Sequence, residues 1–280
     1  MTKYKNMLSK IPFSVLMSIY KNEKINHFEQ CIDSLKKQTI LPNEIIIVLD
    51  GPIQSDLSEK LDYLVKMESI SFVLIPLDKN VGLGYALNIG LTHCSNEWIF
   101  RMDTDDICLP DRFEKQISYI QGNPHISLVG GNTEEFSEDM MISNGQRNIA
   151  CEHNDIIKLA KKRNPFNHMT VAFKKSAVLS VGGYQHHLYM EDYNLWLRMI
   201  AAGYKTHNLQ DILVNVRAGS SMVSRRRGLT YIKSEFQLAK LKIKSKIDSP
   251  LSATIIFFMR SIPRILPTSL LNVIYKKLRK

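Results

Sequence analysis

The first hundred residues contain four short apolar runs, each separated from the next by a stretch long enough to form a helix. The clearest run, Glu44–Leu49 (EIIIVL), stops abruptly at the turn sequence Asp50-Gly51-Pro52. Strands that alternate with helices in this way predict βαβ units and a mostly parallel sheet. The four runs are Phe13–Ile19, Glu44–Leu49, Ser71–Pro76 and Glu97–Met102.

This pattern also predicts where a ligand binds. Right-handed crossovers place the C-terminal ends of the four strands on one edge of the sheet. Open α/β sheets bind their ligands at that edge. Asp50 and Asp103 directly follow the second and fourth runs, so we expect both at the ligand-binding edge.

The second half of the chain is less regular. Strands are expected at Ile126–Gly131 and Val171–Phe173, and helices at Asp155–Lys162 and Asp192–Ala202. We predict an α/β fold with a Rossmann-like, mostly parallel sheet flanked by helices. One body domain, 1–217, is expected to precede a basic helical region, 218–280.

The net charge of +10 is concentrated near the end of the chain. Residues 217–280 carry 15 Lys and Arg against 2 acidic residues, a net charge of +13, whereas the other residues have a net charge of −3. Such a segment favours an anionic partner: a phosphorylated ligand, a membrane surface or a nucleic acid. The sequence has no stripe of aromatic residues for base stacking and no nucleic-acid-binding motif, so a nucleic-acid partner is not expected.

The basic segment also contains short apolar stretches. Leu251–Met259 (LSATIIFFM) has nine residues, against the roughly 20 that a spanning helix needs. Apolar patches interleaved with Lys and Arg favour a segment that lies in the headgroup region of an anionic membrane. The alternative is an ordinary pair of helices packed on the body.

Cysteine usage indicates a reducing compartment. The four cysteines are far apart and form no CxxC pair, which excludes a disulfide scaffold and a cysteine zinc finger. No signal peptide is recognisable at the N-terminus, so a cytoplasmic location is expected. The cysteines are Cys31, Cys94, Cys108 and Cys151.

Asp103-Thr104-Asp105-Asp106 is the strongest local motif. Three carboxylates in four residues repel one another unless a cation or a hydrogen-bond network stabilises them. Mg²⁺ or Mn²⁺ commonly binds one or two carboxylates together with substrate phosphates. The alternative is a polar turn that caps the next helix. A calcium loop is disfavoured, because Ile107 and Cys108 stand where it needs a polar residue and a glycine.

The sequence lacks the signature motifs of several other enzyme classes. Gly82-Leu83-Gly84 follows the third run rather than the first, and Leu87 stands where a dinucleotide fingerprint needs its third glycine. There is also no GxxxxGK[ST] loop, no HExxH and no GxSxG. A nicotinamide dehydrogenase is therefore disfavoured.

Glu191-Asp192 begins the last helix expected in the body. An acid in the first turn is ordinarily a favourable partner of the helix dipole. Asp192, however, shares a helical face with Leu195, Trp196 and Met199, at spacings i, i+3, i+4 and i+7. An acid on an apolar face is costly unless it has a partner or a task, so a site remains an open alternative.

Taken together, these segments resemble family 2 glycosyltransferases of the GT-A fold, in particular the bacterial enzymes that build O-antigen, capsule or exopolysaccharide repeat units (the amylovoran-transferase-like group). The resemblance covers about residues 12–228, and its specificity lies in the order and spacing of the matching pieces. These are FSVLMSIYKNE, SLKKQTILPNEIIIVLDG, NVGLGYALNIGL, FRMDTDDICLPDRFEKQ, NPFNHMTVAFKKSAV, VGGYQHHLYMEDYNLWLRM and VRAGSSMVSRRRG.

The resemblance implies a set of residues that bind the nucleotide-sugar donor. Asp103 and Asp105 would form the metal motif, with Asp103 nearer the ribose and Asp105 on the Mn²⁺ or Mg²⁺ that bridges the diphosphate. Asp106 lies toward the donor sugar. The other implied residues are Ser18, Tyr20, Glu23 and Asp50 at the base and ribose, Asn80 and Asn88 beside the diphosphate, and Arg225, Arg226 and Arg227 in a basic segment that covers it. A solvated or membrane-facing charge run is the alternative for the arginines.

It further implies the groups that act on the acceptor. Asp192 would be the catalytic base, and Glu191 an acceptor-side or supporting residue. His168 would face the donor or the acceptor; a core histidine satisfied by its neighbours is the alternative. A single base without a second carboxylate nucleophile favours single displacement with inversion at the anomeric carbon.

The expected function is therefore an inverting hexosyltransferase. It would move glucose or galactose from a UDP-sugar to a polyprenyl-diphosphate-linked saccharide, forming a β-linkage, at the cytoplasmic face of the bacterial inner membrane. Two alternatives stay open. One is a catalytically silent sugar- or nucleotide-binding protein of the same fold. The other is a sugar nucleotidyltransferase, although the segment Ser18–Ile25 lacks the glycines of a triphosphate loop.

Overall fold

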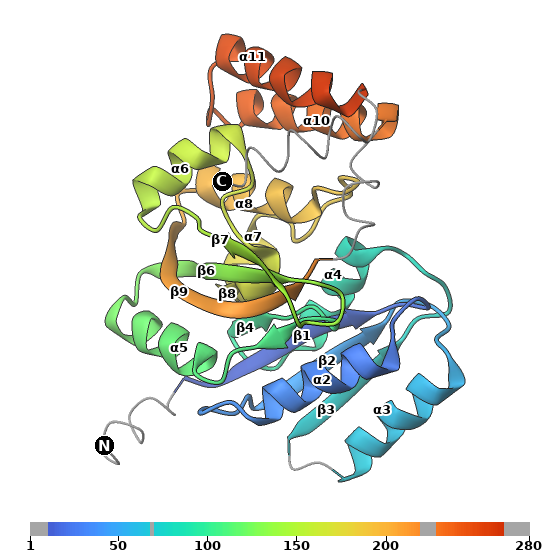
Figure 1. Ribbon diagram of the computed structural model, residues 1–280. Helices are drawn as coiled ribbons and strands as arrows, with labels where there is room; N and C mark the ends of the chain where they lie inside the picture. Colours follow the sequence, from blue (N-terminus) through green and yellow to red (C-terminus); the bar gives the residue numbers. More distant parts are fainter. Residues whose placement is uncertain (1–10, 68–69, 219–227, 266–280) are drawn as a thin grey trace.

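The computed structural model describes residues 11–67, 70–218 and 228–265. One curled sheet runs through the body, with helices on both of its faces (Figure 1). Its first four long strands are β1 (Phe13–Ile19), β2 (Glu44–Leu49), β3 (Ser71–Pro76) and β4 (Trp98–Arg101). They pair in parallel in the order β3-β2-β1-β4, as the alternation of runs and helices predicted.

The second half of the sheet is mixed rather than parallel. β8 (Ala172–Lys174) pairs antiparallel with both β4 and β6 (Ile126–Phe136), and β6 pairs in parallel with β9 (Lys205–Arg217). Two short strands complete the sheet: β5 (Ile107–Cys108) on β9 and β7 (Ser143–Arg147) on β6. The long strand β9 was not expected, because its polar sequence KTHNLQDILVNVR lacks an apolar run like those of the first half.

Two helical layers bury the two faces of the sheet. Along β1 the side chains alternate, so that Val15 and Met17 join the core on one face and Leu16 joins the core on the other. The helices are α2 (Ile25–Lys36), α3 (Ser55–Met67), α4 (Leu83–His93), α5 (Arg112–Gly122), α6 (His153–Lys162), α7 (Lys175–Ser180) and α8 (Glu191–Ala201), with a 3₁₀ turn η1 (His168–Thr170).

The described part of the basic region, residues 228–265, is helical, as expected, and packs on the body. α10 (Gly228–Lys244) lies against α8, and α11 (Pro250–Ser261), followed by the 3₁₀ turn η2 (Ile262–Ile265), lies over α10 (Figure 1). Tyr231 and Leu238 of α10 join the same core as Trp196 of α8. The predicted boundary at 217/218 coincides with the end of β9 and stays a prediction. Across the described ranges, no helix combines the length and apolar character needed to cross a bilayer.

Helix α4 approaches the sheet closely because Gly90 has no side chain. A Cβ at this position would lie 2.5 Å from Leu16 Cδ1 and 2.7 Å from Val48 Cγ2. This close packing holds the start of α4 next to the C-terminal ends of β1 and β2. It therefore contributes to the position of the ligand-binding edge.

We expect Gly90→Ala to lower the free energy of unfolding by about 1–3 kcal/mol, the usual cost of overpacking a core. Gly122→Ala is the matched control, because Gly122 ends α5 and a Cβ added there would have no neighbour within 4 Å. The control should be unchanged or up to about 1 kcal/mol more stable, since alanine favours a helix over glycine. Urea unfolding of both variants measures the difference. Equal stabilities of the two variants would show that Gly90 does not limit the approach of α4 to the sheet.

Candidate functional site

The C-terminal ends of β1, β2 and β4 lie side by side on one edge of the sheet. Ile19 is the register partner of Leu49, and Leu16 pairs with Arg101, so the segments that follow these strands are neighbours. Asp50 directly follows β2 and Asp103 lies two residues after β4. The sequence-based placement of both aspartates at this edge is confirmed.

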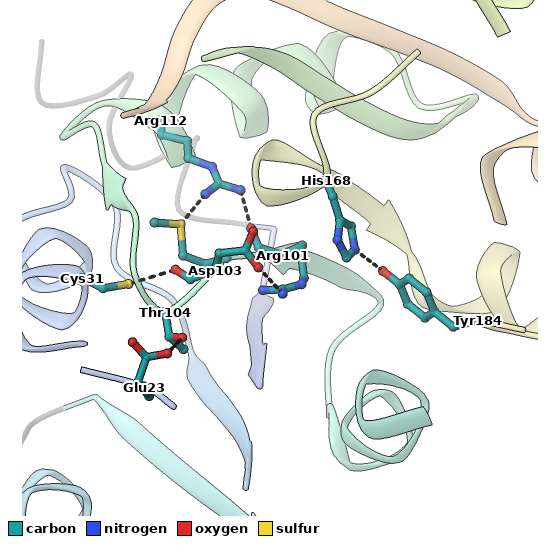
Figure 2. Close-up of polar contacts among 9 residues, drawn as sticks. Glu23, Cys31, Arg101, Asp103, Thr104, Arg112, His168 and Tyr184 are labelled. Carbon is teal, nitrogen blue, oxygen red and sulfur yellow. Dashed lines mark hydrogen bonds and ion pairs between the residues drawn. The ribbon is translucent and has the colours of Figure 1, made fainter. Parts of the chain in front are cut away.

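Two buried arginines hold the Asp103–Asp106 motif in place. The Arg101 guanidinium donates through Nη2 to Asp103 Oδ1, forming an ion pair (Figure 2). The Arg217 backbone N–H donates to Asp106 Oδ1 at 2.9 Å, and Arg217 Nε donates to the Asp105 carbonyl oxygen at 2.9 Å. The motif is therefore a fixed loop with cations behind it, rather than a solvated turn.

The carboxyl groups of this loop are crowded and poorly solvated. Burial, together with the charge of Asp103, raises the pKa of Asp105 to about 6. Burial and the charge of Asp105 raise the pKa of Asp106 well above its ordinary value. The sequence predicted this mutual repulsion. A cation at the motif would relieve it.

Asp105 has the free ligand atoms that such a cation needs. Its carboxyl accepts a hydrogen bond from its own backbone amide, and within the described ranges no other group donates to it. Within the same ranges, no three His, Cys, Asp or Glu side chains are grouped so that they could hold a metal ion by themselves. The residues present thus fit a cation that also binds a ligand's phosphates, which is usual for Mg²⁺.

Glu23 lies beside the same loop. Thr104 Oγ1 donates a hydrogen bond to Glu23 Oε2 (Figure 2). Burial raises the pKa of Glu23 from 4.5 to about 7, and the charges of Asp105 and Asp103 act in the same direction. Of the other residues expected at the base and ribose, Ser18 is half-buried at the end of β1 and Tyr20 is exposed just after it.

The side chains of Asp50 and Asn88 are hydrogen-bonded to other groups of the protein. Asp50 accepts hydrogen bonds from Asn80 Nδ2 at 3.0 Å and from the backbone N–H groups of Val81 and Gly82 at 2.6 and 3.1 Å. Asn88 donates to the Tyr184 carbonyl oxygen at 2.6 Å and accepts from the Tyr184 N–H at 2.8 Å. In this structure the two side chains fix the loop before α4 and the segment around Tyr184.

His168 connects the carboxylate loop with the start of α8. Its Nε2 is hydrogen-bonded to the Tyr184 hydroxyl at 2.9 Å (Figure 2). Burial, and the nearby positive charge of Arg101, lower the pKa of His168 to about 4, while Asp192 and Asp103 act in the opposite direction. His168 is therefore neutral at pH 7, and its ring centroid lies 6.1 Å from that of Trp196 in α8.

Asp192 lies in the first turn of α8, at the half-buried edge of its apolar face. Leu195, Trp196 and Met199 are fully buried, as the helical spacing predicted. Asp192 Oδ2 accepts a hydrogen bond from Asn164 Nδ2 at 2.6 Å. Glu191 packs beside Gly84 of α4, and burial raises its pKa.

Four residues of the site were missed by the sequence analysis: Asn164 and Tyr184, described above, and the two arginines Arg101 and Arg217. Arg101 is 1% exposed, and its Nε and Nη1 have no hydrogen-bond partner among the described residues. A charged residue inside the apolar run WIFRM was the signal that could have identified it. Arg217 also donates to Gln30 Oε1 at 2.7 Å and to the Glu138 carbonyl oxygen. No feature of the sequence around Arg217 distinguishes this residue from the other arginines in the same part of the chain.

The remaining predicted residues of the site have different outcomes. Asp106 is enclosed in the interior, where it accepts the Arg217 N–H, so its carboxyl does not face solvent. Asn80 is exposed beside Asp50. Arg225, Arg226 and Arg227 lie outside the described residues.

The comparisons with known proteins identify the class of protein. The profile described as "Glycosyl transferase family 2" matches residues 14–188, more than half of the chain. The chain therefore belongs to glycosyl transferase family 2. It is 47% identical over 268 residues to the amylovoran biosynthesis glycosyltransferase AmsE of Erwinia amylovora, with 96% of this chain and 99% of that protein covered.

A second relative has a more specific name. The chain is 35% identical over 268 residues to the Escherichia coli protein named UDP-Gal:alpha-D-GlcNAc-diphosphoundecaprenol beta-1,3-galactosyltransferase, with 95% of each covered. Together with the family match, these relatives show that the protein is an enzyme that transfers sugars.

Solved structures show the same fold at low sequence identity. Residues 1–349 of S. aureus TarS in complex with UDP-GlcNAc match with a TM-score of 0.64 at 15% identity, covering 91% of this chain and 72% of that one. The chain spans 43% of a longer TarS structure. The mannosyltransferase PcManGT of Pyrobaculum calidifontis, in complex with GDP-Man and Mn²⁺, matches with a TM-score of 0.62 at 14% identity, covering 99% and 87%. The predicted GT-A fold is confirmed.

We expect Glu23→Gln to change how stability depends on pH. The Glu23 carboxyl ionises near pH 4.5 in the unfolded chain and near pH 7 in the folded protein. Between these values the unfolded state binds fewer protons, so the free energy of unfolding of the parent protein falls as pH rises. The variant has no carboxyl group at this position, so its free energy of unfolding does not fall for this reason. From pH 5 to pH 8, the free energy of unfolding of the variant should therefore rise relative to that of the parent by on the order of 1–3 kcal/mol.

Urea unfolding at both pH values measures this gain. Glu59→Gln, at an exposed position of α3, is the matched control and should follow the parent at both pH values. If Glu23→Gln and the parent differ by the same amount at pH 5 and pH 8, Glu23 is not the buried carboxyl that the structure shows.

Proposed function

We propose that the protein is an inverting hexosyltransferase of bacterial surface-polysaccharide biosynthesis. It transfers galactose or glucose from a UDP-sugar to a lipid-diphosphate-linked saccharide and forms a β-linkage. One observation carries the proposal: the segment around His168 contacts both the end of β4 and α8, because the Arg101 N–H donates to the Val171 carbonyl oxygen at 2.8 Å and the His168 ring centroid lies 6.1 Å from that of Trp196. The relatives named for amylovoran biosynthesis and for galactosyl transfer to a GlcNAc-diphosphoundecaprenol support the substrate class.

The donor nucleotide would bind at the edge formed by β1, β2 and β4. Asp103 would face the ribose, and Ser18, Tyr20 and Glu23 would surround the base and ribose. Asp50 and Asn88 would act through the loops that they fix, because their side chains already contact backbone. Asn80 would lie beside the diphosphate, and the basic segment Arg225–Arg227 would close over it.

Asp105 is the residue that would hold Mn²⁺ or Mg²⁺, with Asp103 as a second oxygen ligand. When bound together with the donor, the cation offsets the negative charge that develops on the departing UDP. Asp106 would position the motif through the Arg217 backbone rather than contact the sugar, because it is enclosed. Arg101 would orient Asp103 through their ion pair.

Asp192 would act as the general base. It takes the proton from the acceptor hydroxyl, whose oxygen bonds to the anomeric carbon while the bond from that carbon to the UDP oxygen breaks. The hydrogen bond from Asn164 Nδ2 holds one of its oxygens, which fixes the orientation of the carboxylate. Neutral His168 and the Tyr184 hydroxyl would contribute hydrogen-bonding groups between donor and acceptor. Glu191 would support the acceptor side.

The two alternatives that the sequence left open do not agree with a family of sugar-transferring enzymes, and each makes a different demand on the site. A catalytically silent binding protein would not need Asp192 for its ligand. A nucleotidyltransferase would need a triphosphate-binding loop after β1, where the segment Ser18–Ile25 offers no glycine.

The proposed reaction takes place at the cytoplasmic face of the inner membrane, because a lipid-linked acceptor is held there.

Substitutions of Asp105 and Asp192 should impair different properties of the enzyme. We expect Asp105→Asn to remove the Mn²⁺-dependent part of UDP binding, because the carboxylate ligand is lost. We expect Asp192→Asn to lower turnover by about 10²–10⁴-fold, the usual contribution of a general base, and to leave UDP binding close to that of the parent.

Titration calorimetry with UDP, with and without Mn²⁺, measures binding, and UDP release from UDP-galactose or UDP-glucose in the presence of a GlcNAc-diphosphate-lipid analogue measures turnover. Each variant is the control for the other, since both exchange one carboxylate for an amide. Unchanged turnover in Asp192→Asn would refute the assignment of the base. Unchanged Mn²⁺-dependent binding in Asp105→Asn would refute the assignment of the metal ligand.

A further inference from the structure

Helix α11 presents large apolar side chains to solvent. These side chains are 51–73% exposed, and the intervals between them are four, three, one and three residues, so they occupy one face of the helix and its 3₁₀ extension. Single exposed apolar residues are ordinary on a protein surface, but a contiguous row of this size marks an interaction surface. The residues, here called the α11 face, are Leu251, Ile255, Phe258, Met259 and Ile262.

The opposite side of α11 is anchored firmly to the protein. Ala253 is buried, and Arg260 Nε donates to Glu235 Oε2 of α10 at 2.7 Å. Arg260 Nη1 also donates to the Lys162 carbonyl oxygen at 3.0 Å. Ser249 caps the N-terminus of the helix by accepting from the Ser252 N–H at 3.2 Å. The orientation of α11 is therefore fixed, and its apolar face is held outward.

The described residues of α10, α11 and the turn between them expose charged groups of one sign only. The acidic residues of the described part of this region, Glu235 and Asp248, are both buried. The exposed charges of α10 and of the turn after it are all positive, and Lys240 lies 4.4 Å from the ring centroid of the exposed Phe236. These exposed lysines are Lys233, Lys240, Lys244 and Lys246. A surface that combines apolar residues with cations, and has no exposed acid, is complementary to an anionic bilayer.

We propose that the α11 face docks on an anionic membrane, with its apolar side chains at the boundary of headgroups and acyl chains and the α10 lysines on the lipid phosphates. The twelve residues of α11 span about 18 Å, too short to cross the roughly 30 Å hydrocarbon core, so the helix lies along the surface. The evidence for this docking surface comes from α10 and α11 alone. Only its biological purpose rests on the proposed function.

The docking surface is connected to the acceptor side of the site. The Ser234 carbonyl oxygen of α10 accepts a hydrogen bond from His187 Nε2 at 2.8 Å, and Tyr231 stacks on Tyr189 at a centroid distance of 5.7 Å. His187 and Tyr189 lie just before Glu191, in the segment that leads into α8. Docking through α11 therefore holds the proposed base in a defined position relative to the bilayer that carries the acceptor.

Flotation of the full chain with vesicles tests the inference. One set of vesicles is phosphatidylcholine alone, and the other contains phosphatidylglycerol as well. The test variant carries Ile255→Gln, Phe258→Gln and Met259→Gln. The matched control carries Met141→Gln and Ile142→Gln, which replace side chains that are 79% and 67% exposed before β7, away from α11. Because all five positions are exposed, both variants should fold, and thermal unfolding and Mn²⁺-dependent UDP binding check this.

We expect the parent and the control to float with anionic vesicles and to bind phosphatidylcholine vesicles at least tenfold more weakly. The triple variant should lose at least tenfold in partitioning to anionic vesicles while its UDP binding stays unchanged. Flotation of the triple variant like that of the parent would overturn the proposal. So would a parent dimer that the triple variant converts to a monomer, because the α11 face would then be an interface between two copies. Vesicle binding by a parent protein that shows neither Mn²⁺-dependent UDP binding nor sugar transfer would refute the proposed function and leave the docking surface in place.

Discussion

The pairing of two buried arginines with a crowded group of carboxylates is the interaction on which the site depends. Three aspartates in four residues cannot share a poorly solvated loop without nearby positive charge. Arg101 supplies it from β4, and Arg217 supplies it from the end of β9, where it also binds the backbone of the motif. The two arginines belong to strands of the same sheet that are separated by β8 and β6, and each binds a different part of the motif. A divalent cation at Asp105, as proposed above, would supply further positive charge to the loop.

The edge of the sheet could be predicted from the sequence because its signals are local. Each of the first four strands is an apolar run, and parallel pairing places Asp50 and Asp103 together whatever the rest of the fold. Strand β9 could not be predicted in this way. Its only apolar run is the three residues Ile212–Val214, and most of the strand is polar; it pairs along its length with β6, a contact between segments about eighty residues apart. Arg217 was missed for the same reason.

Contacts of individual side chains show a second limit of sequence reasoning. The helical spacing correctly placed Asp192 beside the buried Leu195 and Trp196, because periodicity reports which face of a helix is covered. It could not show that Asn164 binds Asp192, or that Asp50 is bound by the backbone before α4. These contacts depend on loops whose paths no local pattern specifies. Likewise, the apolar and basic character of α11 was visible in the sequence, but which side faces outward was not.

The central claim is a single displacement at the anomeric carbon, with a UDP-sugar as donor and a diphosphate-linked saccharide as acceptor. The most direct test is to incubate the purified protein with Mn²⁺, a GlcNAc-diphosphate-lipid analogue and, in turn, UDP-glucose, UDP-galactose, UDP-GlcNAc, GDP-mannose and dTDP-rhamnose, and to determine the anomeric configuration of any product by proton NMR. We predict a β-linked product from UDP-glucose or UDP-galactose. An α-linked product from either donor, or the absence of any product together with the absence of Mn²⁺-dependent UDP binding, would contradict the claim.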